Sequence, residues 1–357
     1  MNPKLLEILR CPVDRKPLRL ELIEEGNKML SGKESTFIKT AILFSESGFF
    51  YPVIAGISRL IVEAYSDYKD FLSLHLADYS IRKNTLEERY GALIQHIQSK
   101  NSHTKKSFEQ EWDLYNYESD KTWNLDSDGL LDRFCTETAE SKESLFGKWI
   151  LDAGCGNGHL NIEMAKAGMQ VVGMDFSLSV VRAFHQNDQE NAHFIQADVE
   201  FPPLPFQFFD VVHSSGVLIH TQRTELSFSS LDPCVKPGGK FSIWAYQPRK
   251  DVIHNLMNRF RSVSSRLPVR IQYVLYACTL LPVSFIVKKL KGNPQNIREM
   301  MVDILDWCSP RYRWEHEKTE VETWFAKRNY PLVQLTDENM WGFNMTGTKQ
   351  SLSLPAN

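Results

Sequence analysis

The chain has 357 residues, enough for two or three domains that bury apolar cores without support from metals or disulfides. Its 41 Lys and Arg residues nearly balance 44 Asp and Glu residues, so the formal net charge is −3. This balance argues against a protein that coats nucleic acid, because phosphate binding needs a basic surface. Aromatic residues make up 11% of the chain, which excludes wholesale disorder.

The six cysteines are scattered and form no CxxC pair, so a disulfide framework is not expected. A reducing compartment is the better expectation, and we predict a cytoplasmic protein. The first ten residues carry charges within a short apolar stretch, which is not the pattern of a signal peptide.

Residues 1–64 are expected to form a small β-rich unit after one short helical turn at residues 5–9. Strands are predicted at residues 18–23, 37–44 and 49–54, because short apolar runs there are separated by Gly and Ser. Residues 65–145 are polar and have a helical rhythm, so we expect a helical connector that serves as a cofactor lid.

Residues 146–250 alternate between strand-like and helix-like segments, and residues 326–350 return to strand sequence. This alternation predicts a parallel sheet with helices on both faces. The predicted strands are 149–151, 170–174, 193–196, 209–213, 240–244, 332–335 and 342–346, and the predicted helices start at 159, at 178 and near 225. Residues 251–325 interrupt this pattern and are expected to form a helical insertion over the substrate site.

The strongest local signal is the segment 151–158 (LDAGCGNG), which follows a strand and opens a helix. Glycine lets the backbone turn sharply, and a helix N-terminus offers free N–H groups to a polar ligand. Asp175 ends the next predicted strand, where a carboxylate can accept hydrogen bonds from both ribose hydroxyls of an adenosine. Asp198 follows the third strand and can accept from an adenine amine. The spacing is GxGxG, not the dinucleotide-binding GxGxxG.

The order of the glycine loop, Asp175, Asp198, Asp210-Val-Val-His and Lys236-Pro-Gly-Gly resembles the class I S-adenosylmethionine-dependent methyltransferases, particularly those acting on small molecules. The resemblance implies an α/β fold with a Rossmann-like, seven-stranded methyltransferase sheet, a helical lid insertion and a small N-terminal domain. A Rossmann fold that binds another nucleotide is the alternative.

The resemblance also implies a role for each matching residue. The loop residues Asp152, Gly154, Cys155 and Gly156 would hold the methionine part of the cofactor. Asp175 would bind the ribose, and Phe176 would pack on the ribose or the adenine. The remaining cofactor residues would be Asp198 and Val199 at the adenine, Ser214 and Ser215 at the sulfonium, and Trp123 in a closing aromatic segment.

His220 follows the fourth core strand and is the candidate catalytic residue, since a histidine can take a proton near neutral pH. Packing of the loop, or contact with the cofactor without proton transfer, are the alternatives for His220. His213 lies within the strand and is expected to be structural. The sequence Ser214-Ser-Gly-Val lacks the Asn-Pro-Pro-Tyr type of motif, which argues against planar exocyclic nitrogens as methyl acceptors.

The N-terminal unit resembles the zinc-ribbon domain of methyltransferase-activator proteins through residues 5–14 and 50–57. Of the cysteines in that pattern, only Cys11 is present, while Asp14, Ser45 and Ser47 stand at or near the other positions. One thiolate cannot build a tetrahedral zinc site, so we predict no metal. The unit is then expected to serve as a packing or dimerising module, and a homodimer is allowed.

Between residues 249 and 291 there are nine Lys and Arg residues and one acidic residue, Asp251. A basic and apolar insertion suggests an anionic or apolar acceptor, or contact of residues 251–291 with a membrane surface. The alternative is a lid whose charges are simply solvated. The apolar segment 271–287 contains Pro282 and is expected to form a buried or surface-lying helix pair. Within the segment that follows, Arg311, Tyr312 and His316 are candidates for substrate binding.

The sequence therefore predicts a biosynthetic, S-adenosylmethionine-dependent methyltransferase acting on a small molecule, with oxygen as the expected acceptor atom and S-adenosylhomocysteine as product. No nucleic-acid partner is expected. The alternatives are an RNA or protein methyltransferase assisted by the N-terminal domain, and a non-catalytic S-adenosylmethionine-binding protein.

Overall fold

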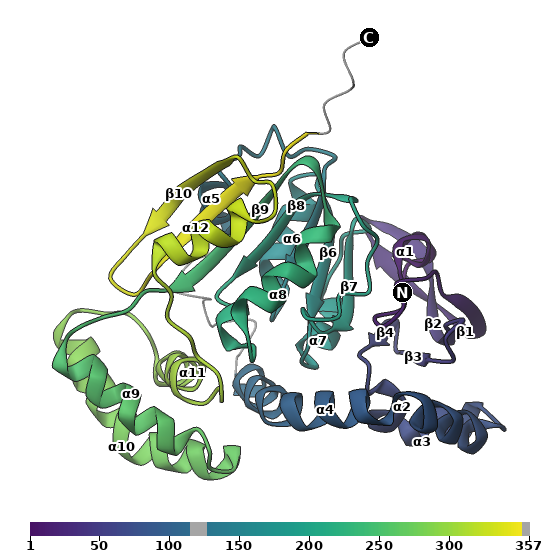
Figure 1. The fold of residues 1–357 in the computed structure, drawn as a ribbon, viewed down its shortest axis with the longest axis horizontal. Coiled ribbons are helices and arrows are strands. Elements are labelled where there is room, and N and C mark those ends of the chain that lie inside the picture. The colour runs from purple at the N-terminus through teal and green to yellow at the C-terminus, as the bar shows by residue number, and fades with distance from the viewer. Residues whose placement is uncertain (115–126, 352–357) are drawn as a thin grey trace.

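A single 11-stranded sheet organises the protein, and the computed structural model describes residues 1–114 and 127–351 of it (Figure 1). The strand order is β1-β2-β3-β4-β7-β6-β5-β8-β9-β11-β10. Seven of these strands, β7 to β10 in this order, form the predicted core. The other four extend the same sheet from the N-terminal side.

The core strands run parallel from β7 to β9, and β11 then pairs antiparallel with both β9 and β10. Parallel strands bring their carboxyl ends to one edge, which is where ligands bind in such sheets. The core strands are β5 (Trp149–Ala153), β6 (Gln170–Asp175), β7 (Ala192–Ala197), β8 (Phe209–Ser215), β9 (Val235–Tyr246), β10 (Leu332–Glu338) and β11 (Gly342–Thr348).

Two hydrophobic layers cover the faces of the core sheet, because successive strand residues point to opposite faces. One layer contains Ile150 and Val171 with side chains of α5 (Ser127–Thr138), α6 (His159–Lys166) and α7 (Ser179–Gln186). The other contains Leu151 and Val172 with side chains of α8 (Thr224–Leu231) and α12 (Lys318–Ala326). The short helices η1 (Leu218–His220) and η2 (Asp232–Cys234) flank α8.

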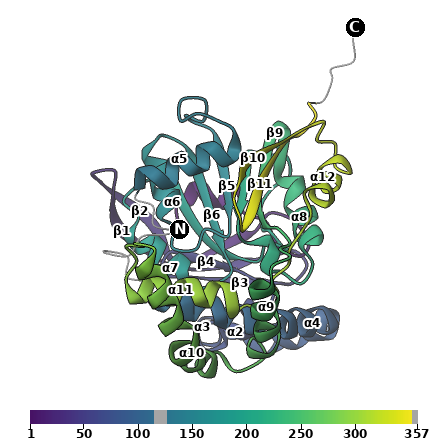
Figure 2. The same cartoon turned by 90° about the vertical axis from the view of Figure 1, so that its left-hand side faces the viewer.

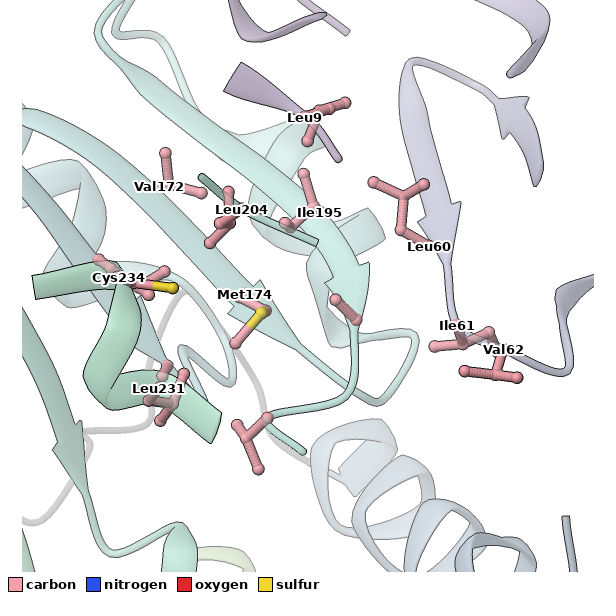
Figure 3. Close-up of a cluster of buried hydrophobic side chains, with 14 of the residues drawn as sticks. Leu9, Leu60, Ile61, Val62, Val172, Met174, Ile195, Leu204, Leu231 and Cys234 are labelled. Carbon is pink, nitrogen blue, oxygen red and sulfur yellow. The ribbon is translucent and has the colours of Figure 1, made fainter. Parts of the chain in front are cut away.

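The N-terminal unit comprises α1 (Pro3–Ile8), β1 (Arg19–Leu30), β2 (Lys33–Phe44), β3 (Phe50–Ile54) and β4 (Ile57–Leu60). The first two strands are longer than the sequence predicts, and β4 was not predicted. β4 pairs in parallel with β7, so the N-terminal strands continue the core sheet. Figure 3 shows the shared core at this junction, where Leu9 and Leu60 lie near Ile195 and Leu204.

The four positions that correspond to zinc ligands in the resembled family come together in the structure. The Ser45 hydroxyl donates to Asp14 Oδ2 at 3.1 Å and lies 2.5 Å from the Ser47 hydroxyl. The Cys11 thiol lies 4.0 Å from Ser47 Oγ and 3.3 Å from Tyr51 Oη. Hydrogen bonds therefore join these side chains to one another. Within residues 1–114 and 127–351, no group of three or more His, Cys, Asp or Glu side chains is placed to hold a metal.

A helical layer lies below the carboxyl edge of the sheet (Figures 1 and 2). It contains α2 (Ala64–Asp67), α3 (Lys69–His75), the long α4 (Tyr79–Leu114), α9 (Val252–Ser264), α10 (Val269–Leu290) and α11 (Ile297–Cys308). α11 packs between α10 and α4. The predicted lid range ends inside α12, whose Trp324 and Phe325 are buried in the core layer with α8.

The prediction of a helix pair across residues 271–287 is wrong, because α10 is one continuous helix of 22 residues through Pro282. Proline removes one backbone donor and usually kinks a helix. The ring lies on the exposed side of α10, while Gln272 and Tyr276 are buried on the other side. Packing of that buried side on α11 accounts for the continuity, since α11 supplies Leu305 and Cys308 to the same apolar cluster as Tyr276.

Candidate active site

The glycine loop leaves β5 at Ala153 and turns towards α6 in a conformation that requires glycine. Gly154, Gly156 and Gly158 have φ values of 98°, 50° and 74°. A Cβ on Gly154 would overlap the side chain of Val217 in the loop after β8. Because a side chain at this position meets both an unfavourable φ and a steric overlap, the backbone is held where a ligand can approach it closely.

Asp175 ends β6 beside this loop, and donors on both sides fix its carboxylate. The Gly156 N–H donates to Oδ2 at 2.9 Å, while the N–H and hydroxyl of Ser177 donate to Oδ1 at 2.8 and 2.7 Å. Burial raises the pKa of Asp175, and these hydrogen bonds oppose the rise. The carboxylate is therefore oriented before any ligand arrives, and Asp175 lines the cavity.

Asp198 follows β7 and is held from two directions. The Glu200 N–H donates to Oδ1 at 2.9 Å, and Asn101 Nδ2 of α4 donates to Oδ2 at 2.8 Å. The buried ammonium of Lys100 lies 3.8 Å from Asp198 and 2.6 Å from Glu200. Two residues of the long helix α4 therefore contact the Asp198 carboxylate. The neighbouring Val199 also lines the cavity.

Asp152 lies next to the end of β5 and belongs to a buried ionic network with His213 of β8 and Glu137 of α5. His213 donates from Nδ1 to Asp152 Oδ1 at 3.1 Å and from Nε2 to Glu137 Oε2 at 2.7 Å. Burial by itself would lower the pKa of His213, but the hydrogen bonds to the two carboxylates raise it to about 9. Arg133 pairs with the other oxygen of Glu137 at 2.7 Å. The positive charges of His213 and Arg133 therefore compensate the negative charges of Asp152 and Glu137 beside the cavity.

Ser214 and Ser215, both predicted to border the sulfonium, point in opposite directions because strand side chains alternate. Ser215 lines the cavity, and its hydroxyl donates to Glu137 Oε1 at 3.2 Å. Ser214 is fully buried, and its hydroxyl donates to the Ala153 carbonyl at 2.8 Å. The Ser214 hydroxyl therefore points away from the cavity that Ser215 lines.

His220 lies at the end of η1 and is buried at the cavity wall. Its Nδ1 lies 3.0 Å from the Tyr312 carbonyl, which only accepts hydrogen bonds, so Nδ1 carries the proton. Nε2 then has a free lone pair and no hydrogen-bond partner among the described residues. Burial lowers the pKa of His220 to about 3, so the ring is neutral at physiological pH.

One cavity of about 1040 Å³ connects these groups and extends under α10 and α11. Tyr312 lines it, as predicted. Arg311 is exposed on the surface and His316 contacts Thr224 of α8 at 2.9 Å, so neither reaches the cavity wall as the structure describes it. Trp123 lies outside the described residues. The other predicted cofactor residues in the cavity wall are Asp152, Gly154, Cys155, Gly156, Asp175, Phe176, Asp198 and Val199.

Several cavity residues were not predicted from the sequence. Asn101 and Phe108 come from α4, Arg133 comes from α5, and Trp244 and Tyr246 come from the end of β9. Trp244 carried the only usable signal, since it ends the predicted strand 240–244 at the carboxyl edge. The helical residues carried none, because a polar side chain on a helix resembles any solvated position until the helix is docked.

Comparisons with known proteins agree with this geometry. Residues 151–243 match the family model described as "Methyltransferase domain". This part of the chain is similar to methyltransferase domains. The matched stretch contains the glycine loop, Asp175, Asp198 and His220, and the predicted α/β Rossmann-like methyltransferase fold is confirmed.

Curated relatives match part of this chain. A ubiquinone biosynthesis O-methyltransferase of Coxiella burnetii is 32% identical over 104 residues, which is 28% of this chain and 44% of the relative. A tRNA U34 carboxymethyltransferase of Pseudoalteromonas translucida is 35% identical over 133 residues, which is 36% of this chain and 39% of the relative. Each match spans less than half of the relative's length.

Among solved structures, the magnesium protoporphyrin IX methyltransferase of Synechocystis with bound SAH is 16% identical to this chain. The comparison covers 71% of this chain and 98% of that one, with a TM-score of 0.41.

Proposed function

We propose that the protein is an S-adenosylmethionine-dependent O-methyltransferase of a small, largely apolar acceptor. The observation that carries the proposal is the convergence of Asp152, Asp175 and Asp198 at the ends of three adjacent parallel strands on one cavity. The cavity also contains the glycine cradle at Gly154, where no side chain fits. These residues fit a ligand that has an ammonium group, a ribose and an adenine in this order.

In this assignment, Asp152 faces the ammonium group and Asp175 accepts from the ribose hydroxyls. Asp198 and the backbone of Val199 hold the adenine, and Phe176 packs on the adenosine. His213 contacts Asp152 through one ring nitrogen and Glu137 through the other. Ser215 is the remaining serine that borders the methyl-transfer position.

When bound, S-adenosylmethionine supplies the methyl group, which passes from its positively charged sulfur to the acceptor oxygen and leaves S-adenosylhomocysteine. The protein's own part is to position the two reactants and exclude water. The acceptor hydroxyl loses its proton to His220 Nε2, which is unpartnered at the cavity wall. The Tyr312 carbonyl stabilises the imidazolium through Nδ1–H. The low pKa leaves Nε2 unprotonated over the whole physiological range, and it also makes this nitrogen a weak base.

The acceptor side of the cavity favours an apolar molecule. Leu280 and Val283 of α10 line it together with Ile304 and Trp307 of α11. Tyr312 is the predicted substrate residue that borders this part. Among the matched relatives, the one named for ubiquinone biosynthesis acts as an O-methyltransferase, which supports oxygen as the acceptor atom.

The test measures methyl transfer and cofactor affinity separately. His220→Ala is expected to lower the transfer rate by about 100-fold or more, which is typical of the loss of a general base, while cofactor affinity stays within about threefold. The measurement is transfer of a labelled methyl group to hydroxylated apolar acceptors, with a binding titration on the same samples. The exposed His96→Ala is the matched control. An unchanged rate in His220→Ala would remove this residue as the base.

An RNA substrate is the second candidate, because one relative is named as a tRNA-modifying enzyme. The net charge of −3 opposes it, since RNA binding rests on a basic surface. Labelled RNA retained on a filter at two salt concentrations separates the two functions, since only a genuine RNA complex weakens steeply with salt.

A further inference from the structure

Helices α9 and α10 lie on the outer side of the helical layer (Figure 1), and both carry exposed apolar side chains. Val252 and Val263 of α9 are 81% and 69% exposed, and Val274 and Leu290 of α10 are 61% and 83% exposed. We call this surface the α9–α10 face; its other exposed apolar members are Ile253, Leu256, Ile271, Val283, Phe285, Ile286 and Val287. Monomeric soluble proteins rarely expose a contiguous apolar surface of this kind without a partner.

The charged side chains within the segment that carries this face have one sign. Residues 252–298 contain eight Lys and Arg residues and no Asp or Glu. Arg266 and Arg270 stand at the beginning of α10, and Lys289 and Lys291 stand at its end. Basic residues therefore flank the apolar stretch at both ends, where they can contact the phosphates of an anionic membrane surface.

The α9–α10 face also adjoins the mouth of the cavity. Val283 and Val287 are 60% and 45% exposed, and both line the cavity. The same turns of α10 therefore contribute to the outer surface and to the acceptor side of the active site. A molecule held in a layer against this face has a direct path to Trp307 and His220.

We propose that the α9–α10 face docks on the surface of an anionic lipid bilayer, and that the acceptor is an amphiphile taken from that bilayer. The substrate part of this inference rests on the proposed O-methyltransferase function, while the docking part does not. Apolar side chains enter the boundary between headgroups and acyl chains, and the flanking Arg and Lys side chains contact lipid phosphates.

A second copy of this chain is a poorer occupant, because it would place two sets of positive charges opposite each other. A membrane-spanning α10 is also disfavoured, although Val269–Leu290 is long and apolar enough by length and composition. Tyr276 donates from Oη to the Cys308 carbonyl of α11 at 3.2 Å, and Lys288 pairs with Asp303 at 2.6 Å. Spanning would break these contacts and expose the buried Gln272 to lipid.

The test is co-sedimentation of the full chain with vesicles of phosphatidylcholine alone and of phosphatidylcholine with 30% phosphatidylglycerol, about a third being a usual anionic content for such assays. The protein is expected to bind the anionic vesicles and to lose binding as salt increases. Val274→Asp and Ile286→Asp are each expected to weaken binding at least tenfold. Arg266→Glu and Arg270→Glu are each expected to weaken it about fivefold or more, from about 1 kcal/mol for each charge near an anionic surface.

Leu74→Asp is the matched control, since Leu74 is 78% exposed on α3 and lies outside the α9–α10 face. Equal binding to both kinds of vesicle, or no binding to either, would overturn the proposal. A concentration-dependent dimer that Val274→Asp abolishes, without vesicle binding, would assign the face to a second copy. Because S-adenosylmethionine affinity is measured on the same samples, failure of docking is distinguishable from failure of the proposed function.

Discussion

At the scale of single residues, the network Glu137–His213–Asp152 connects a buried charge to the cofactor site. His213 is 2% exposed, yet it is a cation at neutral pH because a carboxylate accepts from each ring nitrogen. Glu137 keeps a lowered pKa, since the contacts with His213 and Arg133 outweigh its burial. Removing the histidine would leave two buried carboxylates with only Arg133 to compensate them.

This arrangement predicts a specific dependence of stability on pH. The pKa of His213 rises from 6.5 to about 9 on folding, so its contribution is complete below pH 6.5 and is lost as pH rises through 9. The shift corresponds to about 3 kcal/mol. The free energy of unfolding in urea should therefore fall between pH 6.5 and 9.5 in the natural sequence. In His213→Gln this fall should be absent, and it should persist in the exposed control His96→Gln. An identical pH profile in His213→Gln would contradict the assigned charge.

The sequence was sufficient to identify the carboxylates but not their partners. Asp152, Asp175 and Asp198 lie at or next to the carboxyl ends of strands that the local sequence pattern predicts. Parallel strands bring these ends to one edge of the sheet, so the shared location of the three carboxylates could be predicted. Glu137 and Asn101 reach the site from helices that are distant in sequence, and nothing local distinguishes them from solvated residues. Ser214 and Ser215 could not be assigned to a face because the strand register was unknown.

At the scale of elements, the glycine loop and the loop after β8 fit against each other. Gly154 has a positive φ, and a Cβ there would overlap Val217. We expect Gly154→Ala to weaken S-adenosylmethionine binding at least tenfold and to lower the free energy of unfolding by about 1–3 kcal/mol. Calorimetric titration and urea unfolding measure the two effects.

Gly91 of α4 provides the matched control, since a Cβ there meets open space and its φ is not positive. Gly91→Ala is expected to raise the free energy of unfolding by up to about 1 kcal/mol, because alanine favours the helix. Full cofactor affinity in Gly154→Ala would show that the ligand does not approach this loop closely.

Helices and strands were predicted correctly where the local sequence pattern specifies them. The prediction failed where packing against another helix determines the structure. The core strands and helices begin within a few residues of their predicted positions, because apolar alternation specifies them. α10 was predicted as two helices because Pro282 normally ends or kinks one. Its continuity depends on packing against α11, which the sequence does not reveal.

At the scale of the whole molecule, the N-terminal strands and the core form one sheet. β4 was not predicted. Its parallel pairing with β7 could not be predicted either, because the local sequence does not specify which strands pair. The seven core strands were predicted, since alternating strands and helices specify a parallel sheet. The homodimer and the cytoplasmic location stay predictions.

The central claim is that three carboxylates hold S-adenosylmethionine at the carboxyl edge of this sheet. The most direct measurement is calorimetric titration of S-adenosylmethionine and S-adenosylhomocysteine into the natural sequence, Asp175→Ala and the exposed control Asp70→Ala. We predict micromolar or tighter binding by the natural sequence and the control. Loss of two charge-assisted hydrogen bonds should weaken binding by Asp175→Ala by about 100-fold, or about 3 kcal/mol. Equal affinity in all three proteins, or no binding by the natural sequence, would contradict this account.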